Sequence, residues 1–296
     1  MSRERAAEAA LVWNALVWGA TFVLVKAAIH SISPVLFLAL RFSLATLALL
    51  GLFRGAPKGP WTWKSAAAGA LIGTLLFGGY VFQTLGLQYT TAPKSAFITG
   101  LSAVMVPLLV MIVYRNRPQV SEVAGIMVAT VGMGLMTLEG GIGSIGSISR
   151  GDLLTFFCAV AFAAHIVTLG HFSKFVSFEL LSVSQIAAAA LWALSLFRWM
   201  ETPRLEWRAT VVYAILITGL LATALAFTVQ AWAQRFTSSA RTALIYMLEP
   251  VFAWVTSYLL VGEGLSRRAA AGAVLILGGV VLVELKPLDP RLHPSE

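Results

Sequence analysis

Apolar blocks of about 20 residues, separated by short polar breaks, run along almost the whole sequence. A helix of about 20 residues rises far enough to cross the roughly 30 Å hydrocarbon core of a bilayer. Only 11% of the residues are charged, whereas a soluble domain uses about a quarter of its residues to cover its surface with charge. We therefore expect an all-α integral membrane protein, in which each helix satisfies its own backbone hydrogen bonds.

The breaks between the blocks carry proline, glycine or charge, and they divide the chain into ten expected transmembrane helices. The expected spans are 9–29, 33–53, 64–88, 92–114, 120–138, 151–172, 179–199, 209–233, 239–261 and 269–286. The first block is too long for the apolar core of a signal peptide, so we interpret it as a retained span. Residues 287–296 contain three prolines, and we expect them to form a disordered tail.

The second half of the sequence repeats the first. A shift of 147 positions aligns residues 81–138 with 228–285 without a gap, and a shift of 144 aligns the front ends more loosely. The paired residues include Gln83 and Gln230, Lys94 and Arg241, Gly125 and Gly272, Gly132 and Gly279, Thr21 and His165, and Arg41 and Gln185. The shifts predict a first five-helix repeat over 1–139, a glycine-rich connecting loop over 140–150 and a second five-helix repeat over 151–286.

Because five is an odd number, the second repeat must enter the membrane from the side opposite to the first. Inverted repeats of this kind are typical of secondary transporters, which bind their substrate near the bilayer midplane between the repeats. Basic residues flank the spans of the first half on one side, which predicts that both termini lie in the cytoplasm. The second half gives no preference, because its flanking basic residues are evenly divided.

The net charge of +8 and the pI of about 10.0 do not indicate nucleic-acid binding. The basic residues stand singly or in pairs between apolar blocks, as topology signals do, and form no phosphate-binding patch. Cys158 is the only cysteine, so neither an internal disulfide nor a cysteine-rich metal site can form. We expect no cofactor, and we expect the bilayer and a small-molecule substrate as partners.

The second half carries the most specific motif of the chain. It contains Leu248-Glu249-Pro250-Val251-Phe252-Ala253, then Val261-Gly262-Glu263 and the glycines Gly272, Gly278 and Gly279. The first half carries a variant over 96–108, in which Ser102 stands opposite Glu249. The sequence thereby resembles the EamA-type branch of the drug/metabolite transporter superfamily over nearly its whole length. The resemblance implies ten helices, an inverted repeat and alternating access without ATP, with amino acids or other small metabolites as typical, usually exported, cargo.

Two charged residues, Arg41 and Glu249, stand deep inside apolar blocks, and an ionisable side chain at the centre of a span costs at least about 2.5–3.5 kcal/mol and is a functional candidate. Glu249 lies near the middle of its span, and Pro250 after it favours a kink. We interpret Glu249 either as a protonatable group in the substrate path or as a structural partner of a buried cation. Arg41 has a similar depth, and it can form an ion pair with Glu249 or bind a substrate carboxylate.

Uncharged polar residues form a second group of candidates. His165 is either hydrogen-bonded packing or a proton relay, and its repeat partner Thr21 is also polar. Gln83 and Gln230 either clamp neighbouring helices or line a cavity, because each amide has four hydrogen-bonding sites to satisfy. Several aromatic residues are candidates for an apolar lining, and they include Trp18, Phe97 and Tyr246.

We therefore predict a secondary transporter of the cytoplasmic membrane that moves a small metabolite through a cavity between the repeats, with protons as the candidate coupling ion. Two other functional classes stay open at this point. A passive channel or facilitator is compatible with an inverted repeat. An intramembrane enzyme needs clustered catalytic groups, but no HExxH or Ser/His/Asp arrangement is present. The chain also has no GxxxxGK[ST] motif for ATP.

Overall fold

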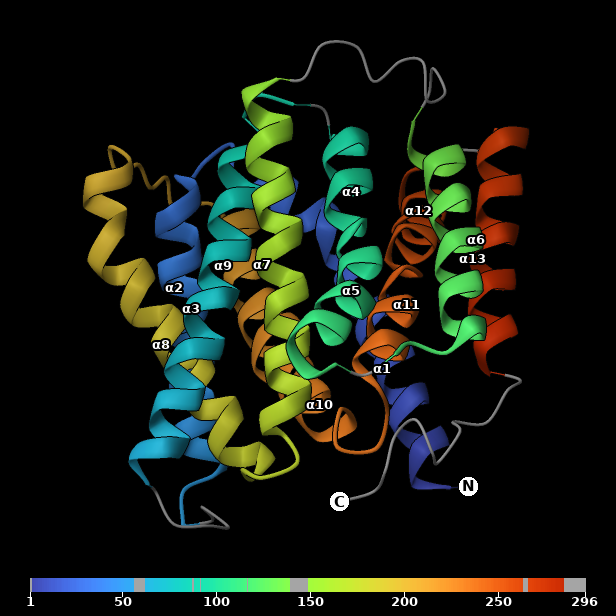
Figure 1. The fold of residues 1–296 in the computed structure, drawn as a ribbon. Helices are drawn as coiled ribbons and strands as arrows, with labels where there is room; N and C mark the ends of the chain where they lie inside the picture. Colours follow the sequence, from blue (N-terminus) through green and yellow to red (C-terminus); the bar gives the residue numbers. More distant parts are fainter. Residues whose placement is uncertain are drawn as a thin grey trace.

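The computed structural model describes residues 2–55, 62–86, 88–90, 92–115, 117–138, 149–262 and 266–284. They form a bundle of helices that run up and down beside one another (Figure 1). The helices are α1 (Arg3–Ala28), α2 (Pro34–Leu52), α3 (Trp63–Gly86), α4 (Ala92–Gly100), α5 (Ser102–Tyr114), α6 (Val120–Thr137), α7 (Arg150–Phe172), α8 (Phe178–Met200), α9 (Ala209–Gly219), the π-helix η2 (Leu220–Leu225), α10 (Ala226–Ala233), α11 (Ser239–Tyr246), α12 (Glu249–Val261) and α13 (Arg267–Glu284).

These helices make ten membrane segments, as predicted. Seven segments are single helices, and the other three are α4–α5, α9–η2–α10 and α11–α12. In the described chain, eight segments are long and apolar enough to span a membrane by length and composition. The remaining two, α1 and α13, carry charged residues at their ends. The predicted loop is described only at 149–150, and the predicted tail lies outside the described residues.

The fourth segment of each half is broken near its middle. In the second half α11 ends at Tyr246, and Pro250 occupies the first turn of α12, where a missing backbone N–H has no cost. In the first half α4 and α5 meet at Leu101, and the shift of 147 places Leu101 opposite Leu248. Ala103 stands there in place of the proline. The expected kink is therefore a complete break. Both repeats have it at equivalent positions, so it does not depend on the proline alone.

The packing of the helices has two-fold symmetry. α1 packs against the α9–η2–α10 segment as α7 packs against α3, and α1 packs against α12 as α7 packs against α5. The pairs α2–α8 and α6–α13 map onto themselves when the halves are exchanged. Since each half has five segments, this exchange inverts the orientation of the repeat in the membrane. The predicted inverted repeat is therefore the architecture of this chain.

Four glycines bring α6 and α13 into backbone contact. A Cβ added to Gly279 would lie 2.5 Å from the carbonyl oxygen of Gly125, and one added to Gly132 would lie 2.6 Å from that of Gly272. The shift of 147 turns one of these contacts into the other. Small residues of this kind let membrane helices approach closely, so the last helices of the two repeats form a symmetric seam.

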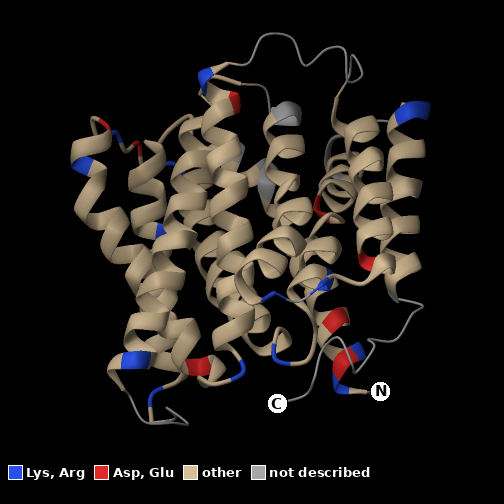
Figure 2. Cartoon of the chain, in the orientation of Figure 1, with Lys and Arg blue, Asp and Glu red and all other residues tan. Residues whose placement is uncertain are grey.

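Charged residues lie mainly at the two ends of the bundle, as Figure 2 shows. We call the end at which α1, α6 and α11 begin the N-terminal face, and the end at which α2 and α7 begin the opposite face (Figure 1). Large apolar side chains such as Leu47, Ile112 and Leu191 are exposed on the outside of the bundle between these ends. Such a surface is stable only where lipid covers it.

Candidate functional site

An aromatic cluster joins the two halves at the centre of the bundle. We define the central cluster as Trp18, Tyr80, Phe162, Phe227 and Tyr246. The Trp18 ring lies 5.4 Å from the Phe227 ring, and the Tyr80 ring lies 5.4 Å from the Phe162 ring. The repeat shifts turn one of these pairs into the other. Tyr246 completes the cluster at 4.7 Å from Trp18.

Arg41 reaches the central cluster from α2. Its guanidinium carbon lies 4.7 Å from the centre of the Tyr80 ring, and Nη2 donates to the Tyr80 hydroxyl at 3.1 Å. Nε donates to Thr223 Oγ1 at 2.6 Å, and Nη2 also donates to the Ala222 carbonyl at 3.2 Å. Both acceptors belong to η2, and single π-turns of this kind are frequent at functional sites.

The ion pair expected between Arg41 and Glu249 is not formed. Within the described chain, no carboxylate oxygen lies within 4.0 Å of the Arg41 guanidinium. The physical reason is that η2 and Tyr80 supply neutral oxygen acceptors to the guanidinium. Nη1 donates to no described residue and so retains hydrogen-bonding capacity.

Glu249 lies at the break between α11 and α12 and is half-buried. No described group donates a hydrogen bond to its carboxylate. Glu249 follows Tyr246, a member of the central cluster, by three residues. It therefore shares the surroundings of the central cluster with Arg41 without being paired to it. The α1 backbone approaches the break closely, because a Cβ on Gly19 would lie 2.6 Å from the Glu249 carbonyl oxygen.

His165 is held by a residue that we did not predict as part of the site. Its Nε2 lies 3.0 Å from Gln185 Oε1, and its ring packs edge-on against Phe227 at 5.7 Å. Both side chains are almost fully buried. Gln185 is aligned with Arg41 in the repeat, and this alignment could have identified Gln185 as a candidate site residue. This arrangement favours hydrogen-bonded packing for His165 over the proton relay.

Asn14 is a second residue that the sequence analysis missed. It is fully buried, and its Nδ2 donates to the Ala226 carbonyl at 2.7 Å and to the Tyr246 hydroxyl at 3.4 Å. One turn later Trp18 Nε1 donates to the Ala222 carbonyl at 2.8 Å. These bonds tie α1 to η2 and α10. A lone asparagine in an apolar block is the signal that would have identified it.

The two predicted glutamines do not reach the central cluster. Gln83 Nε2 donates weakly to Thr99 Oγ1 at 3.5 Å, which connects α3 to α4. Gln230 donates to Gln234 at 3.3 Å, and Gln234 in turn donates to the Ile166 carbonyl of α7 at 3.0 Å. These contacts favour the interpretation of both glutamines as helix clamps.

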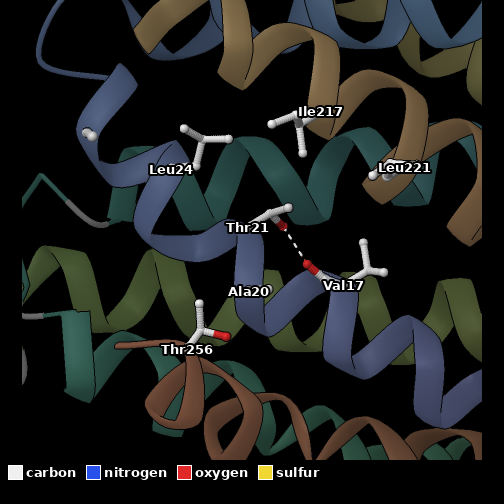
Figure 3. Close-up of a pocket in the computed structure, with 8 residues that line it drawn as sticks. Val17, Ala20, Thr21, Leu24, Ile217, Leu221 and Thr256 are labelled. Carbon is white, nitrogen blue, oxygen red and sulfur yellow. Dashed lines mark hydrogen bonds between the residues drawn. The ribbon is translucent and has the colours of Figure 1, made fainter. Parts of the chain in front are cut away.

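Thr21 and Phe97 also lie away from the central cluster. The Thr21 hydroxyl donates to the Val17 carbonyl of its own helix at 2.8 Å, as Figure 3 shows. It lines an apolar groove of about 490 Å³ between α1, α9, η2 and α12. Phe97 packs against Gly134 of α6. The Thr21 hydroxyl also lies within hydrogen-bond distance of the Trp18 carbonyl of its own helix, at 3.1 Å, but among the described residues neither Thr21 nor Phe97 forms a hydrogen bond with Arg41 or Glu249.

The described residues offer no group of three His, Cys, Asp or Glu side chains that could hold a metal ion. The central cluster presents aromatic faces, and together with the cation of Arg41 and the carboxylate of Glu249 it suits recognition of a small organic molecule.

Comparison with known proteins identifies the fold and the family. The sequence model described as the EamA-like transporter family matches residues 6–138 and 149–285. The chain belongs to the EamA-like transporter family. It is a multi-pass membrane transporter for small molecules, and the family places its function in transport and not in catalysis.

Several curated proteins resemble this EamA-like transporter over nearly their whole length. An uncharacterized transporter of Archaeoglobus fulgidus is 36% identical over 95% of this chain and 86% of its own length. The uncharacterized transporter YyaM of Bacillus subtilis is 29% identical, with 94% of this chain and 93% of YyaM covered. A probable amino-acid metabolite efflux pump of Salmonella typhimurium is 25% identical, with 95% of both chains covered.

A protein of known crystal structure has the same fold. It superposes with a TM-score of 0.81 over 95% of this chain and 98% of its own, at 18% sequence identity.

Proposed function

We propose that this EamA-like transporter exports a small zwitterionic metabolite, such as an amino acid, by alternating access between the two repeats. One observation carries the proposal. Arg41 and Glu249 have opposite charges, come from different halves and share the central cluster, yet they are not paired with each other. A zwitterion has one charge for each of them.

The energetics of burial support this assignment. A charge taken out of water is costly unless a partner of opposite sign compensates it. Nε and Nη2 of Arg41 donate to neutral acceptors, which leaves Nη1 for a ligand. A carboxylate of the ligand can accept a strong, charge-assisted hydrogen bond from Nη1. Glu249 is accessible enough to meet an ammonium group. The surrounding aromatic rings provide apolar contact for the rest of the molecule.

Alternating access would use the symmetry of the fold. In the proposed cycle the repeats 1–139 and 151–286 rock against each other, so that the central cluster faces one side of the membrane at a time. Proton coupling would act through Glu249, since its protonation removes the charge that holds an ammonium group. We place the protein in the cytoplasmic membrane with both termini in the cytoplasm, following the basic residues at the span ends.

Counterflow in proteoliposomes tests the assignment. Competitors of a labelled amino acid should need both charges, so that the corresponding amine without a carboxylate and the acid without an amine compete at least about tenfold more weakly. Glu249→Gln and Arg41→Gln should each raise the half-saturating concentration. Glu206→Gln is the matched control, because Glu206 forms an exposed pair with Arg208 at 2.7 Å that should not affect transport.

Two outcomes would contradict the proposal. Equal competition by the singly charged analogues would exclude recognition of both ends of a zwitterion. Unchanged pH-dependent transport by Glu249→Gln would remove Glu249 from coupling. Metabolite profiling of medium and cells, with and without expression, would then name the class of cargo and the direction of transport.

A further inference from the structure

A buried ion pair lies at the N-terminal face, away from the central cluster. Arg241, in the first turn of α11, is 2% exposed, and its Nη1 donates to Glu8 at 2.8 Å and to Glu4 at 3.0 Å. Both acceptors belong to the first turns of α1. The neighbouring Ser238 caps α11 and donates to Glu122 of α6 at 2.9 Å. Thus α11 of the second repeat is joined to α1 and α6 of the first repeat at this face.

The surroundings of the pair are closely packed. Ala7 and Leu11 of α1 have no exposed surface, and Gln234 at the end of α10 is 1% exposed. Gln234 also donates to the Ile166 carbonyl of α7 at 3.0 Å. A solute moving between the repeats towards the N-terminal face would therefore have to separate α1 from α11, and with them Glu8 from Arg241.

The repeat places the same set of residues at the opposite face. The shift of 144 takes Glu8 to Asp152, and the shift of 147 takes Arg241 to Lys94 and Thr237 to Thr90. At the opposite face Thr90 Oγ1 donates to Asp152 at 2.7 Å. At the N-terminal face the equivalent hydroxyl of Thr237 is enclosed and bonds to no described residue. The two faces thus carry equivalent acid and hydroxyl groups with different hydrogen bonds.

We propose that Glu8 and Arg241 form a gate, in which their ion pair closes the N-terminal face and breaks when that face opens. Asp152 and Thr90 belong to the equivalent gate of the opposite face. Both assignments rest on one part of the proposed function, which is that the two faces open alternately. They do not depend on the identity of the substrate. The gate residues control access and do not bind the substrate, because none of them lies at the central cluster.

A buried ion pair suits this role physically. Two buried charges attract each other strongly but lose their hydration, so that the net stability of the pair is small. When the face opens, the lost attraction is replaced by hydration of both groups. The closed and open states can therefore lie close in free energy, whereas an apolar contact of the same size would favour the closed state alone.

The test measures access to the N-terminal face by cysteine labelling. Leu11→Cys places a reporter one turn beyond Glu8 on α1, and labelling is measured with a membrane-impermeant maleimide relative to the parent chain, in which Cys158 is buried. We expect Glu8→Gln and Arg241→Gln to raise the labelling rate at least about tenfold by shifting the population towards the open face. The charge-swapped variant Glu8→Arg/Arg241→Glu, made together with Glu4→Gln because Glu4 also accepts from Arg241, should return it towards the parent rate.

The matched control is Arg208→Gln, which removes the exposed pair with Glu206 and should leave labelling unchanged. Unchanged labelling in both single variants would overturn the gate, as would a charge-swapped variant that labels as fast as the single ones. If the single variants do not fold, the charge-swapped variant decides the matter. A folded chain with the parent rate supports the gate, and an unfolded chain overturns it. The assay needs no substrate, so a failure of the zwitterion proposal would leave its result unaffected.

Discussion

Two adjacent glycines of α13 allow the seam between the repeats to be tested with an internal control. Gly279 faces α6, whereas Gly278 is exposed and a Cβ there would meet nothing within 4 Å. Substitution of either glycine by alanine removes the same helix-propensity penalty, about 0.8–1.0 kcal/mol. The two variants should therefore differ only in what the added methyl group contacts.

The expected difference follows from the geometry. A methyl group on residue 279 would lie 2.5 Å from the Gly125 carbonyl oxygen, which is 0.9 Å short of the 3.4 Å at which ordinary contact begins. Because this atom belongs to the backbone of the facing helix, the two helices must move apart. Overpacking of this kind costs about 1–3 kcal/mol. We expect Gly279→Ala to be less stable than Gly278→Ala by that amount.

Unfolding of the purified variants in detergent, followed by tryptophan fluorescence, measures the difference. Each kcal/mol should lower the melting temperature of Gly279→Ala relative to Gly278→Ala by roughly 2–4 °C, the scale of soluble domains of 150–250 residues. Gly132→Ala should repeat the result, since its methyl group would meet Gly272 at 2.6 Å. Equal melting temperatures for Gly278→Ala and Gly279→Ala would refute the interpretation of the seam as a sterically required backbone contact.

Three further substitutions have defined expectations. Thr223→Val removes the acceptor that lies 2.6 Å from Arg41 Nε, and losing a hydrogen bond to a charged group, about 1.5–3 kcal/mol, should lower counterflow about tenfold or more while Thr228→Val does not. Trp18→Phe keeps an aromatic ring, although a smaller one, but loses the bond to the Ala222 carbonyl, so thermal unfolding should show a loss of at least about 1 kcal/mol. Glu201→Gln removes the negative charge that accepts from two amides in the first turn of α2, and unfolding should show a loss of about 0.3–1 kcal/mol.

The membrane segments were predictable because their signal is direct. A helix in lipid must be apolar over most of its length, so the hydropathy of the sequence predicts the positions of the spans. The repeat was also predictable, because glycines such as Gly125 and Gly272 have no substitute at a backbone contact. The breaks inside the segments were harder to predict. Proline signals the break at Leu248, but the equivalent break at Leu101 is preceded only by Gly100, and glycine is frequent inside unbroken membrane helices.

The partners of Arg41 were not predictable from the sequence. We expected a carboxylate, because charge is the property that a sequence displays. The structure satisfies the guanidinium with a hydroxyl and a carbonyl of η2, and the residues Leu220–Leu225, which are apolar apart from Thr223, give no indication of a π-helix. Asn14 was predictable in principle, since it is a polar residue in an apolar block, on the same helix as Thr21, which was selected as the repeat partner of His165. The difference between them lies in which side of α1 faces the other repeat, and this depends on packing.

The inverted repeat separates the residues that allow a conformational change from those that recognise a molecule. The seam glycines, the pair of aromatic contacts and the broken fourth segments all have equivalents in the other half, and exchange of two similar states requires this symmetry. Recognition requires the opposite, because a symmetric site would treat both ends of a molecule alike. The charges at the central cluster break the symmetry, since Arg41 is opposite Gln185 and Glu249 is opposite Ser102. On this argument, adding a carboxylate with Ser102→Glu should alter the choice of cargo more than its binding strength, and competition by cationic analogues would reveal the change.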